Sequence, residues 1–184
     1  YSPLFKSGVN WNLLPVALEN IERIEVIKGP FSALYGDQNR AGTVNIVTRS
    51  RARSSIGVDV ASYGSTRATA VIGGLQQSVD TLLIAVMYRT DGYRDNADET
   101  RGTLFLKSSL SVAGQNLSLR FLHHKADWSA PGFLNLNKLT SGAIRPTNRD
   151  TSTPALDGDA ERSNLVFNLT PQQGNDGLSA TLYA

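Results

Sequence analysis

From Ser50 onward, apolar and polar residues alternate along the chain, and this period of two most limits what the chain can fold into. Successive side chains of a β-strand point to opposite faces, so the pattern predicts strands with one apolar and one polar face. The apolar positions are Ile56, Val58 and Val60; Leu104, Leu106, Leu110 and Val112; Leu117, Leu119 and Phe121; Leu165, Phe167 and Leu169; and Leu178, Ala180 and Leu182.

The lengths of these segments and of their connections narrow the fold class. The strands are expected to run about 9 to 11 residues, which is the length that a tilted strand needs to cross a bilayer. Short turns at 114–116 and 172–176 alternate with long polar stretches at 91–100 and 125–161. Short turns at one end and long loops at the other are typical of an outer-membrane barrel. A soluble β-sandwich also alternates, so periodicity alone leaves both folds open.

Composition excludes several other classes. The longest apolar run, Leu82 to Tyr88, is far shorter than the ~20 residues of a membrane-spanning helix. The chain has no cysteine, which excludes disulfides and thiolate chemistry. Lysine and arginine are scattered and the net charge is only +2, so no nucleic-acid partner is expected. No catalytic triad, phosphate-binding loop or zinc spacing appears, so we expect a non-enzyme without cofactor or metal.

The first 50 residues follow a different pattern. Pro15 suits the first turn of a short helix, and residues 21–28 predict a strand that ends at Gly29-Pro30. A helical turn is expected at 31–36 and a second strand at 42–50. This mixed α/β unit is too small to bury a core by itself.

The stretch "ALENIERIEVIKGPFSALYGDQNRAGTVNIVTRS" resembles the last part of the plug domain of TonB-dependent outer-membrane receptors, over roughly residues 15–49. The resemblance implies that residues 1–50 are the C-terminal part of a plug. Residues 51–184 would then be the N-terminal part of a transmembrane β-barrel of about seven antiparallel strands. One departure is Ala41-Gly42, where the family often has paired glycines.

The resemblance also implies that this sequence is a fragment of a receptor. Neither a signal sequence nor a TonB box is visible before Tyr1, and receptors of this kind close at about 22 strands. With about seven strands, the chain would leave open sheet edges.

In such receptors the plug lies inside the barrel, and this placement would explain a charged strand. Buried charges are tolerated when they are paired, so the resemblance implies pairing between plug and barrel-wall charges. The candidates are Glu22, Arg23, Glu25 and Lys28.

The polar loop after the "SALYG" turn is the part of the plug that the family uses for substrate contact. The resemblance implies ligand binding there, although a packed tyrosine and a solvated turn would give the same sequence. The candidates are Tyr35, Asp37, Gln38, Asn39 and Arg40.

Four other features have ordinary readings. Residues 91–96 lack the spacing of an EF-hand and predict a polar external loop. His123 and His124 are adjacent, so on a strand they face opposite sides and cannot share a metal. Trp128 and Phe133 suit an interfacial aromatic girdle or loop packing better than a ligand-binding mouth.

The expected function is therefore uptake of a scarce nutrient, a ferric siderophore first, at the bacterial outer membrane. The implied partners are TonB, acting on an N-terminal segment, the small-molecule substrate and outer-membrane lipid. The alternatives are a receptor for cobalamin or another solute, and a soluble β-rich binding or structural module.

Overall fold

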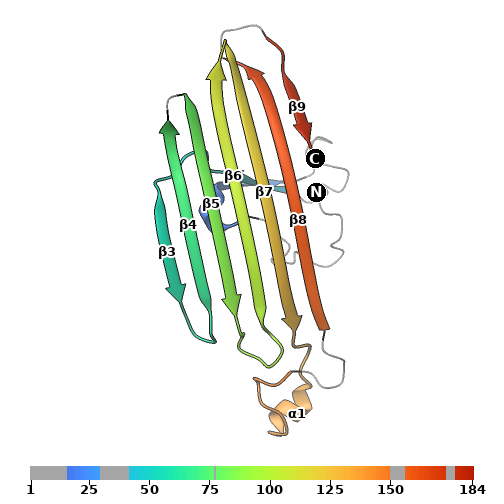
Figure 1. Ribbon diagram of the computed structural model, residues 1–184. Coiled ribbons are helices and arrows are strands. Elements are labelled where there is room, and N and C mark those ends of the chain that lie inside the picture. Colours follow the sequence, from blue (N-terminus) through green and yellow to red (C-terminus); the bar gives the residue numbers. More distant parts are fainter. Residues whose placement is uncertain (1–15, 30–41, 77, 150–155, 173–176) are drawn as a thin grey trace.

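The computed structural model describes residues 16–29, 42–76, 78–149, 156–172 and 177–184. Within them lie a two-stranded and a seven-stranded antiparallel sheet (Figure 1). The elements are the 3-10 helix η2 (Leu18–Asn20), β1 (Ile21–Lys28), β2 (Gly42–Thr48), β3 (Ser55–Val60), β4 (Thr66–Gln76), β5 (Val79–Thr90), β6 (Glu99–Val112), β7 (Gln115–Ala130), α1 (Leu136–Thr140), β8 (Leu156–Pro171) and β9 (Ala180–Tyr183).

The two-stranded sheet confirms both strands expected in the first 50 residues. β1 pairs with β2 so that Ile24 lies opposite Ile46 and Val26 opposite Val44. The short helix predicted before β1 is a single 3-10 turn, and Pro15 lies outside the described residues. Gly42 begins β2 with φ +149°, where an added Cβ would lie 2.4 Å from the Ile27 carbonyl oxygen. This glycine of the Ala41-Gly42 pair is therefore required by the strand pairing.

The seven-stranded sheet is a meander in which each strand pairs with its sequence neighbour, in the order β3 to β9. Hairpin-connected antiparallel strands of this kind build up-and-down barrels. The expected fold class, part of a β-barrel preceded by part of a small plug unit, is confirmed. Among the described residues, no helix is long and apolar enough to cross a membrane.

The strands are longer than the sequence predicts. β5 to β8 have 12, 14, 16 and 16 residues, because cross-strand pairing continues past the apolar positions into polar sequence. β7 runs to Ala130 and β8 begins at Leu156, so the connection between them is 131–155 rather than 125–161. At the opposite end, β6 and β7 are joined by Ala113-Gly114, one residue before the turn expected at 114–116.

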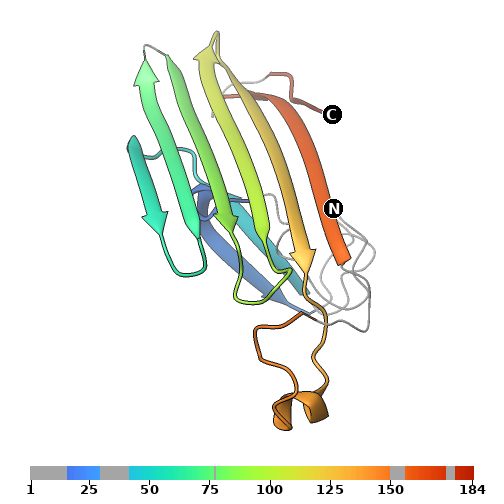
Figure 2. The same ribbon diagram turned by 60° about the horizontal axis from the view of Figure 1, so that its bottom comes forward.

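The two faces of the large sheet have opposite characters. We call the face that lies against the two-stranded sheet the inner face and its opposite the outer face (Figures 1 and 2). Register places large apolar side chains on the outer face, and these are exposed. They are Ile56, Val58, Val60, Ile72, Leu104, Leu165, Phe167 and Leu182.

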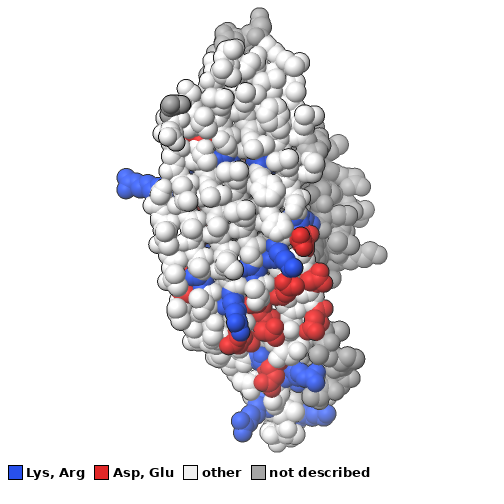
Figure 3. Space-filling model, viewed as in Figure 1, with Lys and Arg blue, Asp and Glu red and all other residues white. Residues whose placement is uncertain are grey.

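The outer face is almost uncharged over most of its length (Figure 3). Acidic side chains gather only near the ends of β7 and β8 that join the long connection; the exposed ones are Asp127, Asp157, Asp159 and Glu161. An apolar face left exposed, opposite a covered face that carries charged side chains such as Arg67 and Lys107, is the arrangement of a barrel wall in lipid. A soluble sandwich would bury its apolar faces instead.

β3 differs from the half-buried strand that alternation predicts, since all six of its residues are exposed. Within the described part of the chain β3 pairs with β4 alone and forms one edge of the sheet.

The buried core lies on the inner face, where the large sheet meets the chain segment around η2. Leu82, Ile84 and Phe105 are almost completely buried there, and Ala17 belongs to the same cluster. Val71, Val86 and the partly buried Ala52 and Leu122 complete it. The contact between the large sheet and the segment around η2 is therefore the main packed interface of the described residues.

Candidate functional site

A partly buried ion pair joins Glu19 of η2 to Arg67 of β4 on the inner face. Arg67 Nη2 lies 2.6 Å from Glu19 Oε2, and both side chains are largely covered. The 3-10 turn positions Glu19, because the Asn20 amide donates to the Ala17 carbonyl while Ala17 packs against the wall. A charge-assisted hydrogen bond in a partly buried place is stronger than a surface ion pair.

Asn20 follows directly and is 1% exposed. Neither polar atom of its side-chain amide has a hydrogen-bond partner among the described protein atoms. A buried amide without hydrogen-bond partners costs free energy. The Asn20 side chain therefore lowers the stability of the contact between η2 and the large sheet. Its backbone carbonyl accepts from the Arg49 amide at 2.7 Å, which ties the start of β1 to the end of β2.

The segment from Ser50 to Ser54 crosses the inner face and holds the two sheets together. Lys107 of β6 donates to Ser50 Oγ at 2.8 Å, and Arg51 forms an ion pair with Asp80 of β5. Ser54 Oγ accepts from the Gly73 amide at 3.1 Å.

Gly73 of β4 makes this crossing possible. An added Cβ at Gly73 would lie 2.0 Å from the Ala52 carbonyl oxygen, whereas the same atom at Gly74 would meet nothing within 4 Å. The two glycines are adjacent in one strand and face opposite sides. The backbone of the crossing segment therefore occupies the space that a side chain at Gly73 would fill.

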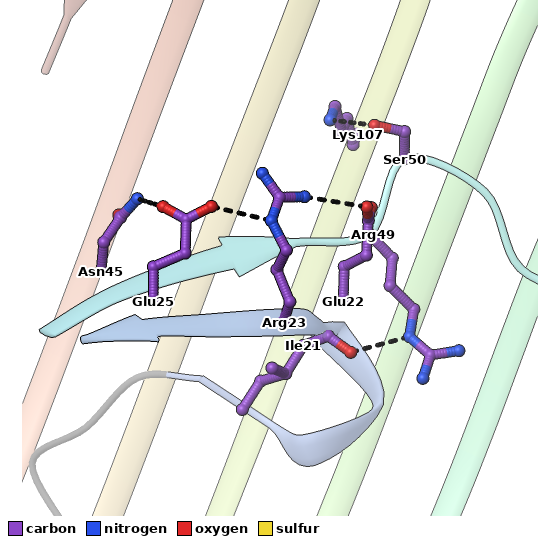
Figure 4. Close-up of polar contacts among 8 residues, drawn as sticks. All are labelled: Ile21, Glu22, Arg23, Glu25, Asn45, Arg49, Ser50 and Lys107. Carbon is purple, nitrogen blue, oxygen red and sulfur yellow. Dashed lines mark hydrogen bonds and ion pairs between the residues drawn. The ribbon is translucent and has the colours of Figure 1, made fainter. Parts of the chain in front are cut away.

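The charged residues of β1 that the resemblance singled out bind mainly to one another (Figure 4). Arg23 donates to Glu25 at 2.8 Å and to Glu22 at 3.1 Å, and the Asn45 amide of β2 donates to Glu25 at 2.8 Å. These side chains are exposed within the described part of the chain, as is Lys28. Their proposed pairing with barrel-wall charges remains a prediction.

The contacts of Glu25 have an electrostatic consequence. Hydrogen bonds from Asn45 and then from Arg23 lower the pKa of Glu25 below its ordinary value of 4.5, because they stabilise the carboxylate. The hydrogen bond to Glu25 and its negative charge raise the pKa of Arg23 in turn. Arg49 closes this small network by donating to the Ile21 carbonyl at 2.8 Å.

The candidate ligand-binding residues Tyr35, Asp37, Gln38, Asn39 and Arg40 lie outside the described residues, as does the helical turn expected at 31–36. Their role remains a prediction.

The remaining candidates are placed as follows. His124 is buried on the inner face and shares a 2.8 Å hydrogen bond with Thr103, while His123 bonds to Ser163 across the outer face. Trp128 packs against Gly158 within the sheet, and Phe133 is 92% exposed. Among the described residues, no group of three or more side chains could hold a metal ion.

Sequence reasoning missed Glu19 and Arg67. Glu19 is part of the quoted plug-like stretch, but its partner is 48 positions away on a strand whose register is not readable from sequence. The alternating segments recognised in the sequence do not include the one around Arg67, so no sequence signal identified it.

Comparison with known proteins agrees with this architecture. Residues 4–43 match the family of the TonB-dependent receptor plug domain. The ferric enterobactin receptor PirA of Pseudomonas aeruginosa is 27% identical over 178 residues, covering 86% of this chain and 23% of PirA. The vitamin B12 transporter BtuB of Vibrio vulnificus is 45% identical over 58 residues, covering 32% of this chain and 9% of BtuB.

Two further similarities extend the set. The iron-regulated outer membrane virulence protein of Vibrio cholerae is 52% identical over 42 residues, covering 23% of this chain and 6% of that protein. Among solved structures, the ferric-catecholate import receptor Fiu of E. coli K12 has the same fold, with a TM-score of 0.58 at 19% identity. That match covers 86% of this chain and 27% of Fiu. The chain therefore spans about a quarter of the length of PirA and of Fiu.

The plug-like unit, the wall sheet with its apolar outer face, and these relatives agree: the chain is similar to the part of a TonB-dependent outer-membrane receptor in which the plug domain ends and the barrel wall begins.

Proposed function

We propose that the receptor containing this chain takes up a scarce nutrient across the outer membrane, and that its substrate is a ferric siderophore. Residues 1–50 serve as part of the plug and residues 51–184 as part of the wall that surrounds it. TonB supplies the energy by acting on an N-terminal segment of the receptor. The protein transports its substrate without chemical change and is not an enzyme.

One observation carries this proposal. Within the described residues the plug-like unit contributes only one small side chain, Ala17, to the apolar cluster on the inner face, and specific polar contacts, Glu19 to Arg67 and Lys107 to Ser50, hold it against the wall. An interface of charged pairs and an unpartnered buried amide can be exchanged for water at modest cost, whereas an apolar core cannot. Such an interface suits a plug that must rearrange during each transport cycle.

The extent of the similarities favours a ferric siderophore over cobalamin. PirA, named for ferric enterobactin, matches along 86% of this chain, including strands of the wall. BtuB, named for vitamin B12, matches over 32%. Substrate choice in such a protein rests on loops between wall strands, so the longer match is the more informative one.

Uptake by cells tests the proposal. The full-length receptor is expressed in a strain that lacks its own siderophore receptors, and uptake of radiolabelled iron as ferric enterobactin is measured beside uptake of radiolabelled vitamin B12. We expect iron uptake that disappears when TonB is deleted. Uptake of vitamin B12 alone would assign the cobalamin alternative, and recovery of the protein in the soluble fraction would favour the soluble β-rich module.

The ligand contacts proposed for the plug loop are tested in the same strain. Tyr35→Ala and Arg40→Ala are each expected to weaken substrate binding more than tenfold, equivalent to about 1.4 kcal/mol. Asp37, Gln38 and Asn39 are expected to contribute less individually, since neutral hydrogen bonds contribute about 1 kcal/mol or less on balance. An affinity within about twofold of the wild type for both alanine variants would contradict this placement of the site.

A further inference from the structure

Two of the long connections lie side by side at the end of the sheet opposite the Ala113-Gly114 turn (Figures 1 and 2). One is residues 91–98 between β5 and β6, and the other runs from residue 131 to 155 between β7 and β8. We call them the short loop and the long loop. In outer-membrane barrels the long connections are external, so both loops belong to the outside of the cell.

Arg94 of the short loop is the centre of their contact. Its guanidinium donates four hydrogen bonds, all to main-chain carbonyl oxygens of the long loop. Nε and Nη2 donate to Asn148 at 3.0 and 2.9 Å. Nη1 donates to Gly132 at 2.7 Å and Nη2 to Pro131 at 3.2 Å.

These acceptors come from two separate parts of the long loop. Pro131 and Gly132 begin it, and Asn148 lies after α1 near the other end of its described part. The rigid planar fork of an arginine can hold several acceptors at fixed directions, which the flexible point charge of a lysine cannot. Arg94 therefore holds the start of the long loop, before α1, and the segment around Asn148, after α1, in fixed positions.

Other hydrogen bonds surround this clamp. The Asp95 amide donates to the Thr147 carbonyl at 2.7 Å, and the Ser129 amide donates to the Asp98 carbonyl at 2.9 Å. The side chain of Asn96 reaches the Ala130 carbonyl at 3.2 Å. Together they make the two loops a single hydrogen-bonded layer.

The layer extends to the hairpin between β3 and β4. The rings of Tyr63 and Tyr93 meet edge to face with centroids 5.4 Å apart, and the Asp91 amide donates to the Tyr63 carbonyl at 2.9 Å. All three external connections of the described sheet are therefore linked through the short loop.

We propose that Arg94 is a positioning residue that holds the short and long loops together as one body, and that substrate capture by the receptor depends on this union. The second half rests on the proposed function, since it requires the external loops to receive a substrate. Arg94 acts through the loops and need not touch the substrate itself. Because its acceptors are all main-chain carbonyls, replacement of the long loop's side chains would leave the clamp intact.

The decisive variant is Arg94→Gln in the full-length receptor, which removes the charge and the fork. The matched control is Arg89→Gln, five residues before Arg94 on the same hairpin. Arg89 loses the same charge, but its side chain is 74% exposed and has only a 3.7 Å ion pair with Asp91. Hydrogen exchange of the purified receptor, without substrate, reports on the union of the loops directly.

We expect Arg94→Gln to speed exchange about tenfold at the amide of Asp95, which donates from the short loop to Thr147 of the long loop. Arg89→Gln is expected to change it less than twofold. Affinity for ferric enterobactin is expected to fall about tenfold in Arg94→Gln and to stay unchanged in Arg89→Gln. The amount of receptor that shifts on boiling should be equal in both, which separates a positioning role from failure to fold.

A disulfide provides the rescue. The Asp95 amide and the Thr147 carbonyl are 2.7 Å apart, so these two positions are chosen for the cross-link, and residues 1–184 contain no cysteine that would compete. Asp95→Cys and Thr147→Cys, added to Arg94→Gln, are expected to restore affinity when oxidised and to lose it when reduced.

The outcomes separate the two proposals. Equal exchange in Arg94→Gln and Arg89→Gln would overturn the clamp, whatever the substrate. Fast exchange with unchanged affinity for a transported substrate would overturn the dependence of capture on it. If the wild type transports no siderophore, that dependence falls together with the proposed function, and the exchange data still decide whether Arg94 unites the loops.

Discussion

The two sheets of this chain use charge in opposite ways. The two-stranded sheet carries Glu22, Arg23 and Glu25 on one short strand and satisfies them with neighbours from β1 and β2. The seven-stranded sheet keeps its outer face almost free of charge over most of its length and carries Arg67 and Lys107 on its inner face, where they contact the plug-like unit and the segment that follows it. One sheet is built to lie in a wet interior, and the other to separate that interior from lipid.

The difference teaches that alternation alone does not say which face of a strand is covered. Leu165 and Asn164 alternate as they would in any half-buried strand, yet the leucine is 42% exposed and belongs to the outer face. The location of the plug-like unit identifies the inner face, because Ala17, Ala52 and Glu19 all contact it.

The largest expected effect comes from placing a charge on each face of one strand. Leu165→Lys should destabilise the receptor in lipid vesicles by about 2–4 kcal/mol, the cost of a cation on the lipid face near the bilayer midplane. Asn164→Lys, its neighbour on the inner face, should cost less than about 1 kcal/mol because it meets a wet interior. Urea unfolding of the refolded full-length receptor measures both. A cost below about 0.5 kcal/mol for Leu165→Lys would mean that this face is in water.

The adjacent glycines of β4 sharpen the comparison at the plug contact. Gly73→Ala should cost about 2 kcal/mol, because its Cβ would overlap the Ala52 carbonyl oxygen and displace the crossing segment. Gly74→Ala faces open space and should be neutral or slightly stabilising. The same unfolding assay compares them, and equal effects would show that the crossing segment does not lie against β4.

The Glu19–Arg67 pair should couple the two sheets by about 1 kcal/mol, between the values for surface and buried pairs. A double-mutant cycle with Glu19→Gln and Arg67→Gln measures this coupling. The exposed pair of Arg23 and Glu22 is the reference and should give a weaker coupling, because solvent screens it. A larger coupling energy for Arg23–Glu22 than for Glu19–Arg67 would show that the plug-like unit is not held to β4 through Glu19.

Acid should have the smallest effect, through Glu25. Its folded-state pKa is lower than the unfolded value of 4.5, so its stabilising contribution is complete above 4.5 and is lost as the pH falls through the lowered pKa. Asn45→Ala removes the largest cause of the shift, so the loss of stability in acid should become smaller and should be complete at a higher pH. The midpoint of urea unfolding is measured between pH 6 and pH 3 in both proteins. The same pH dependence in Asn45→Ala and wild type would show that Asn45 does not stabilise the Glu25 carboxylate.

Much of this architecture could be predicted from the sequence, and the exceptions have physical reasons. β1, β2 and the shared faces of Leu104 and Leu106 followed from local periodicity, since side-chain direction in a strand is a local property. The ends of β7 and β8 were misplaced, because pairing there is maintained by neighbouring strands and not by apolar residues.

Contacts between distant segments were beyond the reach of sequence reasoning. Glu19 finds Arg67 only through the position of the plug-like unit on the wall. Arg94 was read as part of a polar loop, because its acceptors are main-chain carbonyls, and every residue type carries one.

The most direct test of the central claim is to locate the outer face in the membrane. Single cysteines at positions 164 to 168, each carrying a fluorescent label, are placed in the full-length receptor in vesicles whose lipid chains bear nitroxide quenchers. We predict strong quenching at 165 and 167 and weak quenching at 164, 166 and 168, a period of two with Leu165 and Phe167 in lipid. Weak quenching at all five positions, or strong quenching at Asn164 and Val166 instead, would contradict the account.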